Sequence, residues 1–185
     1  MASPSGGGGS VLQLIGVVLG TLILALAVIG IVFVAGMRRK SPAVLRAVRR
    51  FNRAVVNPRA LKTAGTPGAY ASVIHHVGRT TGRAYRTPVA AEPTGDGFVI
   101  ALPYGTTANW VKNVLASGSA TIVDEGASYR VDHPEIVPLA GVLDHFPVKD
   151  RKGLARFRVD QCVRVRRVDP LEPSAQPTEP SAPPR

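Results

Sequence analysis

The sequence contains no acidic residue before Glu92, although the 185-residue chain carries a formal net charge of +11. The first 91 residues hold 12 Lys and Arg, whereas the remainder holds 11 basic and 12 acidic residues. An excess confined to one half indicates a local anionic partner, such as lipid headgroups or an acidic ligand. Aromatic residues are only 5% of the chain, too few for a base-stacking surface, so no nucleic-acid partner is expected.

Cysteine is nearly absent as well, because Cys162 is the only one. A single cysteine excludes an intramolecular disulfide and agrees with a reducing compartment. No Cys/His cluster has the spacing of a zinc site, and His75 and His76, adjacent in an expected strand, point to opposite faces. The nucleophile elbow and the glycine-rich nucleotide-binding patterns are missing too. With no acid/base pair evident, an enzyme of this sequence would depend on a cofactor for its chemistry.

What the sequence does contain is an apolar run over residues 11–37, interrupted only by Gln13 and Thr21. As a helix of about 40 Å it exceeds the roughly 30 Å of bilayer hydrocarbon, which predicts a transmembrane helix. A cleaved signal peptide is the alternative, but it would carry positive charge before a shorter apolar stretch. Residues 1–10 are uncharged, rich in glycine and expected to be disordered. A buried core helix would show a polar face, which this run lacks.

Basic residues follow the apolar run, beginning with Arg38, Arg39 and Lys40. The positive-inside rule therefore predicts a single-pass protein of the cell membrane, with its N-terminus outside and the rest of the chain in the cytoplasm. Residues 38–62 show apolar side chains at helical spacing with arginines between them, and Asn57-Pro58 is expected to end this helix. It is interpreted as an interfacial helix on anionic lipid, as the first helix of the domain, or as both.

Residues 63–168 are expected to form the folded domain. Strands are predicted over 70–77, 85–91, 98–102, 120–123, 128–131 and 162–168, and helices over 106–117 and 149–158, with threonine caps before the first helix and Gly118 after it. Many short strands and few helices predict an α+β fold, a small and mostly antiparallel β-barrel with flanking helices. Residues 169–185 contain six prolines and are expected to be a disordered tail.

A loop bounded by glycines is the first candidate for a ligand site. Its residues are Gly78, Arg79, Thr80, Thr81, Gly82 and Arg83. Two permissive glycines let several backbone N–H groups face one anion, and the arginines add bidentate contacts to phosphate or carboxylate. A hairpin turn with solvated arginines explains the same residues equally well. Both interpretations stay open at this point.

Two further segments and one helix face could contribute to a site. Thr87-Pro88-Val89 places a residue that cannot donate a ladder hydrogen bond in a strand, which predicts that the strand lies at a sheet edge or opens toward something there. Pro103-Tyr104-Gly105 precedes a helix start, where free N–H groups can receive polar ligand atoms. Trp110, Asn113 and Val114 share one face of that helix. The simpler alternatives are an edge strand, a core tryptophan and an asparagine that caps a loop.

Taken together, these motifs resemble the deazaflavin-dependent nitroreductase family. The resemblance covers about residues 70–138 and rests on the order and spacing of four motifs, Gly78–Arg83, Arg86–Val89, Ala101–Gly105 and Asn109–Leu115. Members of this family bind the deazaflavin coenzyme F420 in a split β-barrel related to that of FMN-binding proteins. The resemblance therefore implies such a barrel, preceded here by one transmembrane helix.

By this resemblance, the loop from Gly78 to Arg83 holds the phosphate and oligoglutamate tail of the reduced coenzyme, with Arg86 beside it. The segment Thr87, Pro88 and Val89 passes the deazaflavin ring. Six residues close the ring pocket or pack behind it, namely Pro103, Tyr104, Gly105, Trp110, Asn113 and Val114. Quinone- and nitro-reducing members often have serine where Pro103 stands, and they carry C-terminal tyrosines, whereas Tyr129 is the last tyrosine here. No catalytic residue and no metal site are assigned.

The reaction implied by the resemblance is hydride transfer from reduced F420 to a quinone, a nitro compound or another electrophilic acceptor. Because the domain follows a membrane anchor, we expect a small lipophilic electron acceptor and the lipid bilayer as its partners, and a homodimer is an assembly compatible with this reading. Two alternatives remain open. One is a non-catalytic barrel that binds F420 or lipid, and the other is an FMN-binding relative.

Overall fold

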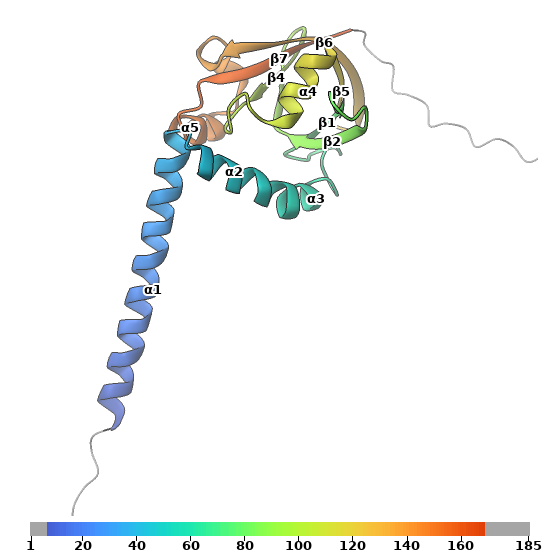
Figure 1. Cartoon of the computed structure of the whole chain (residues 1–185). Helices are drawn as coiled ribbons and strands as arrows, with labels where there is room; N and C mark the ends of the chain where they lie inside the picture. The colour runs from blue at the N-terminus through green and yellow to red at the C-terminus, as the bar shows by residue number, and fades with distance from the viewer. Residues whose placement is uncertain (1–6, 169–185) are drawn as a thin grey trace, which may run out of the picture.

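The computed structural model describes residues 7–168, so the expected disorder of residues 1–6 and 169–185 lies outside the described residues. The first helix, α1 (Gly7–Arg38), begins before the predicted start at residue 11. By length and composition, Val11–Arg38 is apolar enough to cross a membrane, and its most apolar stretch is not buried by the domain, although Met37 near its end is buried. Figure 1 shows it projecting from the folded part as a single long helix. A core helix would be covered, so this reading of the apolar run is excluded.

The basic segment after α1 is helical for longer than predicted. It consists of α2 (Pro42–Phe51), a π-helical turn η1 (Asn52–Val56) and α3 (Asn57–Ala60). The prediction that Asn57-Pro58 ends the helix is wrong. The amide of Asn57 bonds to the carbonyl of Asn52, five residues back, and this wider turn lets Pro58 occupy the first turn of a new helical segment, where its missing N–H is not needed.

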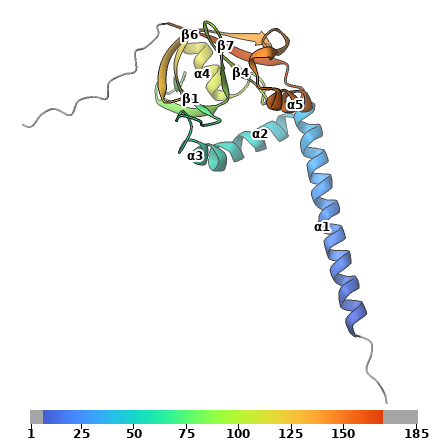
Figure 2. The same ribbon diagram turned by 180° about the vertical axis from the view of Figure 1, so that it is seen from behind.

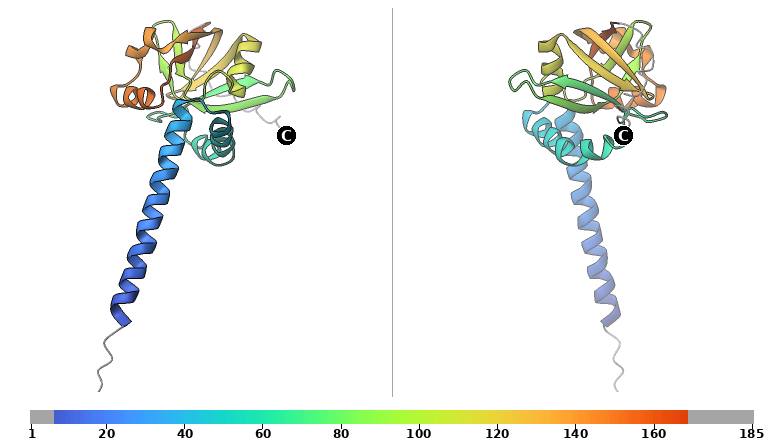
Figure 3. Two further views of the ribbon diagram at one scale, coloured as in Figure 1. Left: turned by 60° about the vertical axis from the view of Figure 1, so that its left-hand side comes forward. Right: turned by 90° about the vertical axis from the view of Figure 1, so that its right-hand side faces the viewer.

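The segment from α2 to α3 lies at a steep angle to α1 and runs along one side of the barrel (Figure 3). The bend is tight because Gly36 lies against Val44, and a Cβ atom on the glycine would collide with a Val44 methyl carbon. One face of α2 is buried through Leu45, which is 6% exposed, whereas Phe51 is 58% exposed. The helix therefore docks on the domain and still presents an apolar and basic outer face.

The strands form one curled antiparallel sheet of seven strands, in the order β2-β1-β5-β6-β7-β4-β3. They are β1 (Ser72–Val77), β2 (Ala84–Val89), β3 (Ala91–Pro93), β4 (Gly97–Ala101), β5 (Ser119–Asp124), β6 (Ala127–Pro138) and β7 (Gln161–Arg167). The predicted α+β fold is confirmed as a half-barrel with flanking helices. The strand predicted over 85–91 is divided, because the chain bends at Ala90 and contributes both edges of the sheet. Pro88 lies in edge strand β2, as its missing N–H required.

The concave face of the sheet holds the main hydrophobic core, which is closed by helix α4 (Asn109–Ser117). Val111 and Val114 of α4 are fully buried against sheet residues that include Ile74, Phe98 and Ile122. Gly118 ends α4 in the left-handed conformation at φ 71°, as predicted. The threonine caps are not formed: Ala108 is the N-cap residue and makes no side-chain cap bond. Thr107 instead accepts a hydrogen bond from Arg49 of α2.

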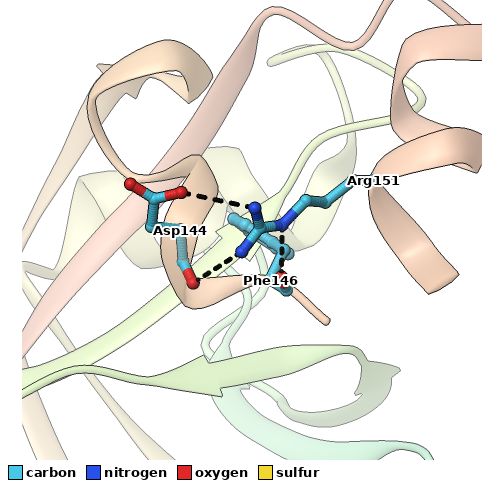
Figure 4. Close-up of polar contacts among 3 residues, drawn as sticks. All are labelled: Asp144, Phe146 and Arg151. Atoms are coloured by element: carbon cyan, nitrogen blue, oxygen red, sulfur yellow. Dashed lines mark hydrogen bonds and ion pairs between the residues drawn. The ribbon is translucent and has the colours of Figure 1, made fainter. Parts of the chain in front are cut away.

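A second core lies on the other face of β4 and β7, beneath helix α5 (Val148–Arg156) and the short turns η2 (Leu139–Gly141) and η3 (Leu143–His145). Figure 2 shows α5 beside the upper end of α1, away from α3. Arg151 holds η3 to α5 by donating to the carbonyl oxygens of Phe146 and Asp144 and to the Asp144 carboxylate (Figure 4). Alternate residues of β7 therefore pack into different cores. Val163 and Val165 lie in the main core, and Cys162 lies in the second core.

Candidate functional site

Four side chains form one continuous series of hydrogen bonds, which we call the polar chain. Three of them, Arg79, Asn113 and Thr87, come from predicted motifs, and the fourth, His76, comes from strand β1. Asn113 Oδ1 accepts from the Arg79 guanidinium at 2.9 Å and from the Arg79 backbone amide at 3.3 Å. Asn113 Nδ2 lies 3.2 Å from His76 Nδ1, and His76 Nε2 lies 3.1 Å from Thr87 Oγ1. The polar chain thus joins the glycine-bounded loop to α4 and to edge strand β2.

The donors and acceptors along the polar chain determine its protonation. Arginine can only donate, so Asn113 Oδ1 is an acceptor and its amide nitrogen donates to His76 Nδ1. His76 Nδ1 is then unprotonated, and His76 Nε2 carries the hydrogen and donates to Thr87. The Thr87 hydroxyl keeps its own hydrogen, for which the described residues offer no recorded acceptor. Both ends of the polar chain, Arg79 and Thr87, can therefore donate to a ligand.

An aromatic contact holds His76 in place. The rings of His76 and Tyr85 stack with centroids 5.7 Å apart and 19° between their planes, and the Tyr85 hydroxyl lies 3.4 Å from Thr81 Oγ1. Gly78 fits beneath this pair, because a Cβ atom there would come within 2.6 Å of Thr81 Oγ1 and 2.7 Å of the Tyr85 ring. The first glycine of the loop is therefore required by close packing.

Several backbone amides of the loop are used within the loop itself. Gly78 N donates to the Arg83 carbonyl, and the amides of Thr81 and Gly82 donate to the Gly78 carbonyl. Arg83 N approaches Thr81 Oγ1 at 3.4 Å. These amides close a hairpin turn, so the nest of free amides that the two glycines suggested is not formed. Any anion at this loop would be held mainly by side chains.

The cationic side chains of the two neighbouring motifs do not all lie together. Arg79 contacts α4 through Asn113, while Arg83 is exposed at the end of the turn. Arg86 pairs with His75, whereas Tyr85 and Thr87 pair with His76 and Ile74. Because side chains alternate along a strand, Arg86 lies on the opposite face of β2 from Thr87. The structure therefore does not bring Arg86 to the polar chain.

The segment Pro103-Tyr104-Gly105 faces the basic helical segment. The Tyr104 hydroxyl accepts a hydrogen bond from Asn52 Nδ2 of η1 at 2.8 Å, and Arg49 Nη1 donates to Thr107 at 2.7 Å. Both contacts tie the loop before α4 to the segment that follows α1. Sequence patterns gave no sign of this link, because its partners lie 52 and 58 residues apart in the chain.

The apolar residues predicted for the site lie mainly in the core. Val89 and Val114 are buried with 8% and 0% exposure, so they can only pack behind a ligand. Trp110 is partly buried and packs on the same core, and Pro88 lies on the edge strand with intermediate exposure. His76 is the site residue that sequence reasoning missed. In the sequence, His75 and His76 were considered only as metal ligands and excluded because adjacent strand residues point to opposite faces. A polar residue in an otherwise apolar strand could have indicated a hydrogen-bonded site residue.

Residues 7–168 contain no group of three or more His, Cys, Asp or Glu that could hold a metal ion. Two grooves of the described residues lie along α1, away from the polar chain. One of about 660 Å³ runs along α1 toward Arg156 and Arg158, and one of about 320 Å³ lies between α1 and α2. The candidate site is therefore defined by its polar chain and loop.

No protein-family model and no curated protein matches the sequence. Among solved structures, the chain is similar to one described as a domain-swapped dimer, with a TM-score of 0.43, 12% identity, and coverage of 65% of this chain and 97% of that chain. It is also similar to one described as an F420 reductase, with a TM-score of 0.40, 16% identity, and coverage of 58% and 92%. These similarities are distant, and neither protein's ligand transfers to this chain through them.

Acidification is expected to destabilise the domain through its two adjacent histidines. Burial, and then the charge of His75, lower the pKa of His76 below its ordinary value of 6.5. Burial and then Arg86 also lower the pKa of His75. Because the pKa values of both side chains are lower in the folded state, the unfolded chain takes up more protons as pH falls below 6.5. The contribution of these two histidines to the free energy of unfolding should be fully present above pH 6.5 and decrease as pH falls below it.

Thermal unfolding of the full chain in detergent at pH 7.5 and 5.5 would test this. His76→Gln should reduce the difference between the two pH values, because glutamine offers hydrogen-bonding atoms but does not titrate. His75→Gln serves as the matched control for the neighbouring histidine. An equal difference in the unaltered chain and in His76→Gln would contradict the assignment of a neutral His76.

Proposed function

We propose that this protein is a membrane-anchored oxidoreductase that binds the reduced deazaflavin coenzyme F420 and delivers its hydride to a lipophilic acceptor such as a quinone. One observation carries the proposal: motifs that resemble the deazaflavin-dependent family in sequence lie together in space, joined by the polar chain. Arg79, Asn113 and Thr87 come from three separate motifs. These three motifs are far apart in the chain, and they meet, through His76 of β1, in one series of hydrogen bonds.

The donors at this site fit an anionic, oxygen-rich ligand. Arg79 has guanidinium N–H groups beyond the one that bonds Asn113, Arg83 is exposed beside it, and Thr87 has a hydroxyl hydrogen to offer. Nearby carboxylates are not among their recorded partners within residues 7–168. In this proposal, Arg79 and Arg83 hold the phosphate and carboxylate groups, and Thr87 orients the ring by a hydrogen bond.

The bound coenzyme would supply the hydride, and the protein residues would bind and orient it. Asn113 and His76 do not reach the ligand in this scheme. They hold Arg79 and Thr87 at the two ends of the polar chain, so the tail-binding and ring-binding groups keep a constant separation. Val89 and Val114 provide an apolar surface behind them, which excludes water from the reacting atoms.

The anchor supports a lipophilic acceptor. The helix over Val11–Arg38 is long and apolar enough to span a bilayer, and Arg38, Arg39 and Lys40 follow it, which favours a cytoplasmic domain with the N-terminus outside. The segment from α2 to α3 would then lie along the membrane surface with the barrel above it (Figure 3). A quinone in the bilayer could reach the domain without crossing bulk water.

The test is a titration of the full chain, purified in detergent, with reduced F420, followed by addition of a menaquinone analogue. We expect saturable binding and then oxidation of the coenzyme, seen as recovery of its visible absorbance, with one quinone reduced per coenzyme oxidised. Binding without oxidation would favour the non-catalytic barrel, and a yellow purified protein with flavin fluorescence would favour the FMN-binding relative. Absence of binding would reject the proposal.

A further inference from the structure

The larger of the two grooves lies where the membrane anchor meets α5. It has a volume of about 660 Å³ and is lined by α1 from Ala27 onward, by Arg38 and Arg39 at the end of α1, and by Arg156 and Arg158 of the α5 segment. Its α1 wall is apolar up to Ala35 and basic after that. We infer that this groove binds one anionic glycerophospholipid, with an acyl chain along α1 and the phosphate among the four arginines. The inference rests on the proposed membrane anchoring.

The length of the groove matches one leaflet of a bilayer. From Ala27 to Arg38 an α-helix rises about 16 Å, and half of a bilayer's hydrocarbon core is about 15 Å thick. If the apolar segment spans the membrane, the deep end of the groove lies near the bilayer centre. The arginine end then lies at the level of the lipid phosphates.

The charge at the groove's outer end selects for a net negative headgroup. No carboxylate in the described residues 7–168 pairs with Arg38, Arg39, Arg156 or Arg158. Of the acids near α5, Asp144 bonds Arg151 (Figure 4), Asp150 lies by the Tyr70 hydroxyl, and Asp160 is exposed and forms no ion pair with these four arginines. The cationic group of a zwitterionic lipid would be repelled by these guanidinium groups, because no acid pairs with them. An anionic lipid without such a cationic group would not be repelled.

The two halves of the groove are held together by packing. Phe157 meets Phe33 of α1 edge to face, with ring centroids 6.2 Å apart, so the end of α5 is fixed on the anchor. Arg158 follows at a positive φ of 49°, a conformation that a non-glycine residue adopts at some cost. A lipid phosphate shared by arginines of α1 and α5 would join the anchor to the barrel and hold the barrel at a defined orientation to the membrane.

Lipid binding can be measured by native mass spectrometry of the full chain in detergent, offered equal amounts of phosphatidylglycerol and phosphatidylcholine with identical acyl chains. We expect phosphatidylglycerol adducts to exceed phosphatidylcholine adducts by about tenfold or more. The double variant Arg156→Gln/Arg158→Gln should lose this preference. The matched control Arg130→Gln/Arg166→Gln removes the same charge from exposed positions on β6 and β7 and should keep it.

Two further arms make the result decisive. Arg156→Gln/Arg158→Gly replaces the residue at positive φ by one that adopts it freely, so loss of lipid preference with an unchanged unfolding midpoint excludes misfolding as the cause. Inorganic phosphate at millimolar concentration should not displace the lipid, because it cannot fill the apolar part of the groove. Displacement by phosphate, equal binding of the two lipids, or an unchanged preference in both variants would overturn the inference. Alkaline carbonate extraction of membranes and the F420 titration report separately on the anchor and the coenzyme site.

Discussion

Replacing Arg79 and Arg83 together by alanine is expected to weaken F420 binding by about 2–4 kcal/mol, or roughly 30- to 1,000-fold. Most of the loop amides already donate to protein groups, either within the turn or to Asn113, so the guanidinium groups are the main donors left for an anionic tail. Arg79 is held by Asn113 at 2.9 Å and should contribute more than Arg83, which is exposed and has no recorded partner among the described residues. The measurement is a titration of the full chain followed by coenzyme fluorescence.

The control for charge is Arg130→Ala/Arg166→Ala, which lowers the net charge equally at exposed positions on the barrel. Its affinity should match that of the unaltered protein. Raising the ionic strength should weaken binding in the unaltered protein more than in the Arg79→Ala/Arg83→Ala variant, because exposed charge pairs are screened. If the variant binds F420 as tightly as the unaltered chain does, the loop is only a hairpin turn.

The second large effect is expected from Asn113, which lies at the centre of the polar chain and is 6% exposed. Asn113→Leu keeps the branched shape and the number of heavy atoms of the side chain but removes the acceptor for Arg79 and the donor to His76. Two groups, the Arg79 amide and His76 Nδ1, then lack partners in a buried or partly buried place. We expect the free energy of unfolding to fall by about 2–4 kcal/mol, measured by denaturant unfolding of the full chain in detergent.

The matched control is Lys112→Leu, which places the same residue type one position earlier in α4, where the side chain is exposed. It should change stability by a few tenths of a kcal/mol at most. In Asn113→Leu the pH dependence below pH 6.5 should also change, because His76 loses the donor that favours its neutral form. A stability equal to that of Lys112→Leu would mean that the polar chain contributes nothing to the fold.

The features that the sequence predicted correctly are those that depend on residues close together in the chain. The apolar run is a helix, Gly118 ends α4, the strand with Pro88 is an edge strand, and the fold class follows from short strands around a few helices. The error at Asn57-Pro58 is also local. A π-helical turn is rare, so proline was given its usual role as a helix end.

The composition of the site could not be derived in the same way. Arg79 meets Asn113 across 34 residues, and Asn113 meets His76 across 37. Which side chains meet at such separations depends on strand register, and a shift of one residue would turn Arg86 toward the polar chain and Thr87 away from it. The motifs named segments only, and the register of β1 and β2 brought Thr87 to His76 and placed Arg86 on the other face.

The sequence by itself determined the long apolar helix, the uneven charge and the segments that make up the barrel, because hydrophobic periodicity and turn residues act over a few residues. Only the tertiary structure decided that His76 links Arg79 to Thr87, that η1 bonds the Tyr104 loop, and that Arg156 and Arg158 stand beside the end of α1. Those arrangements arise when two cores pack on opposite faces of one curled sheet. No local pattern encodes the resulting distances.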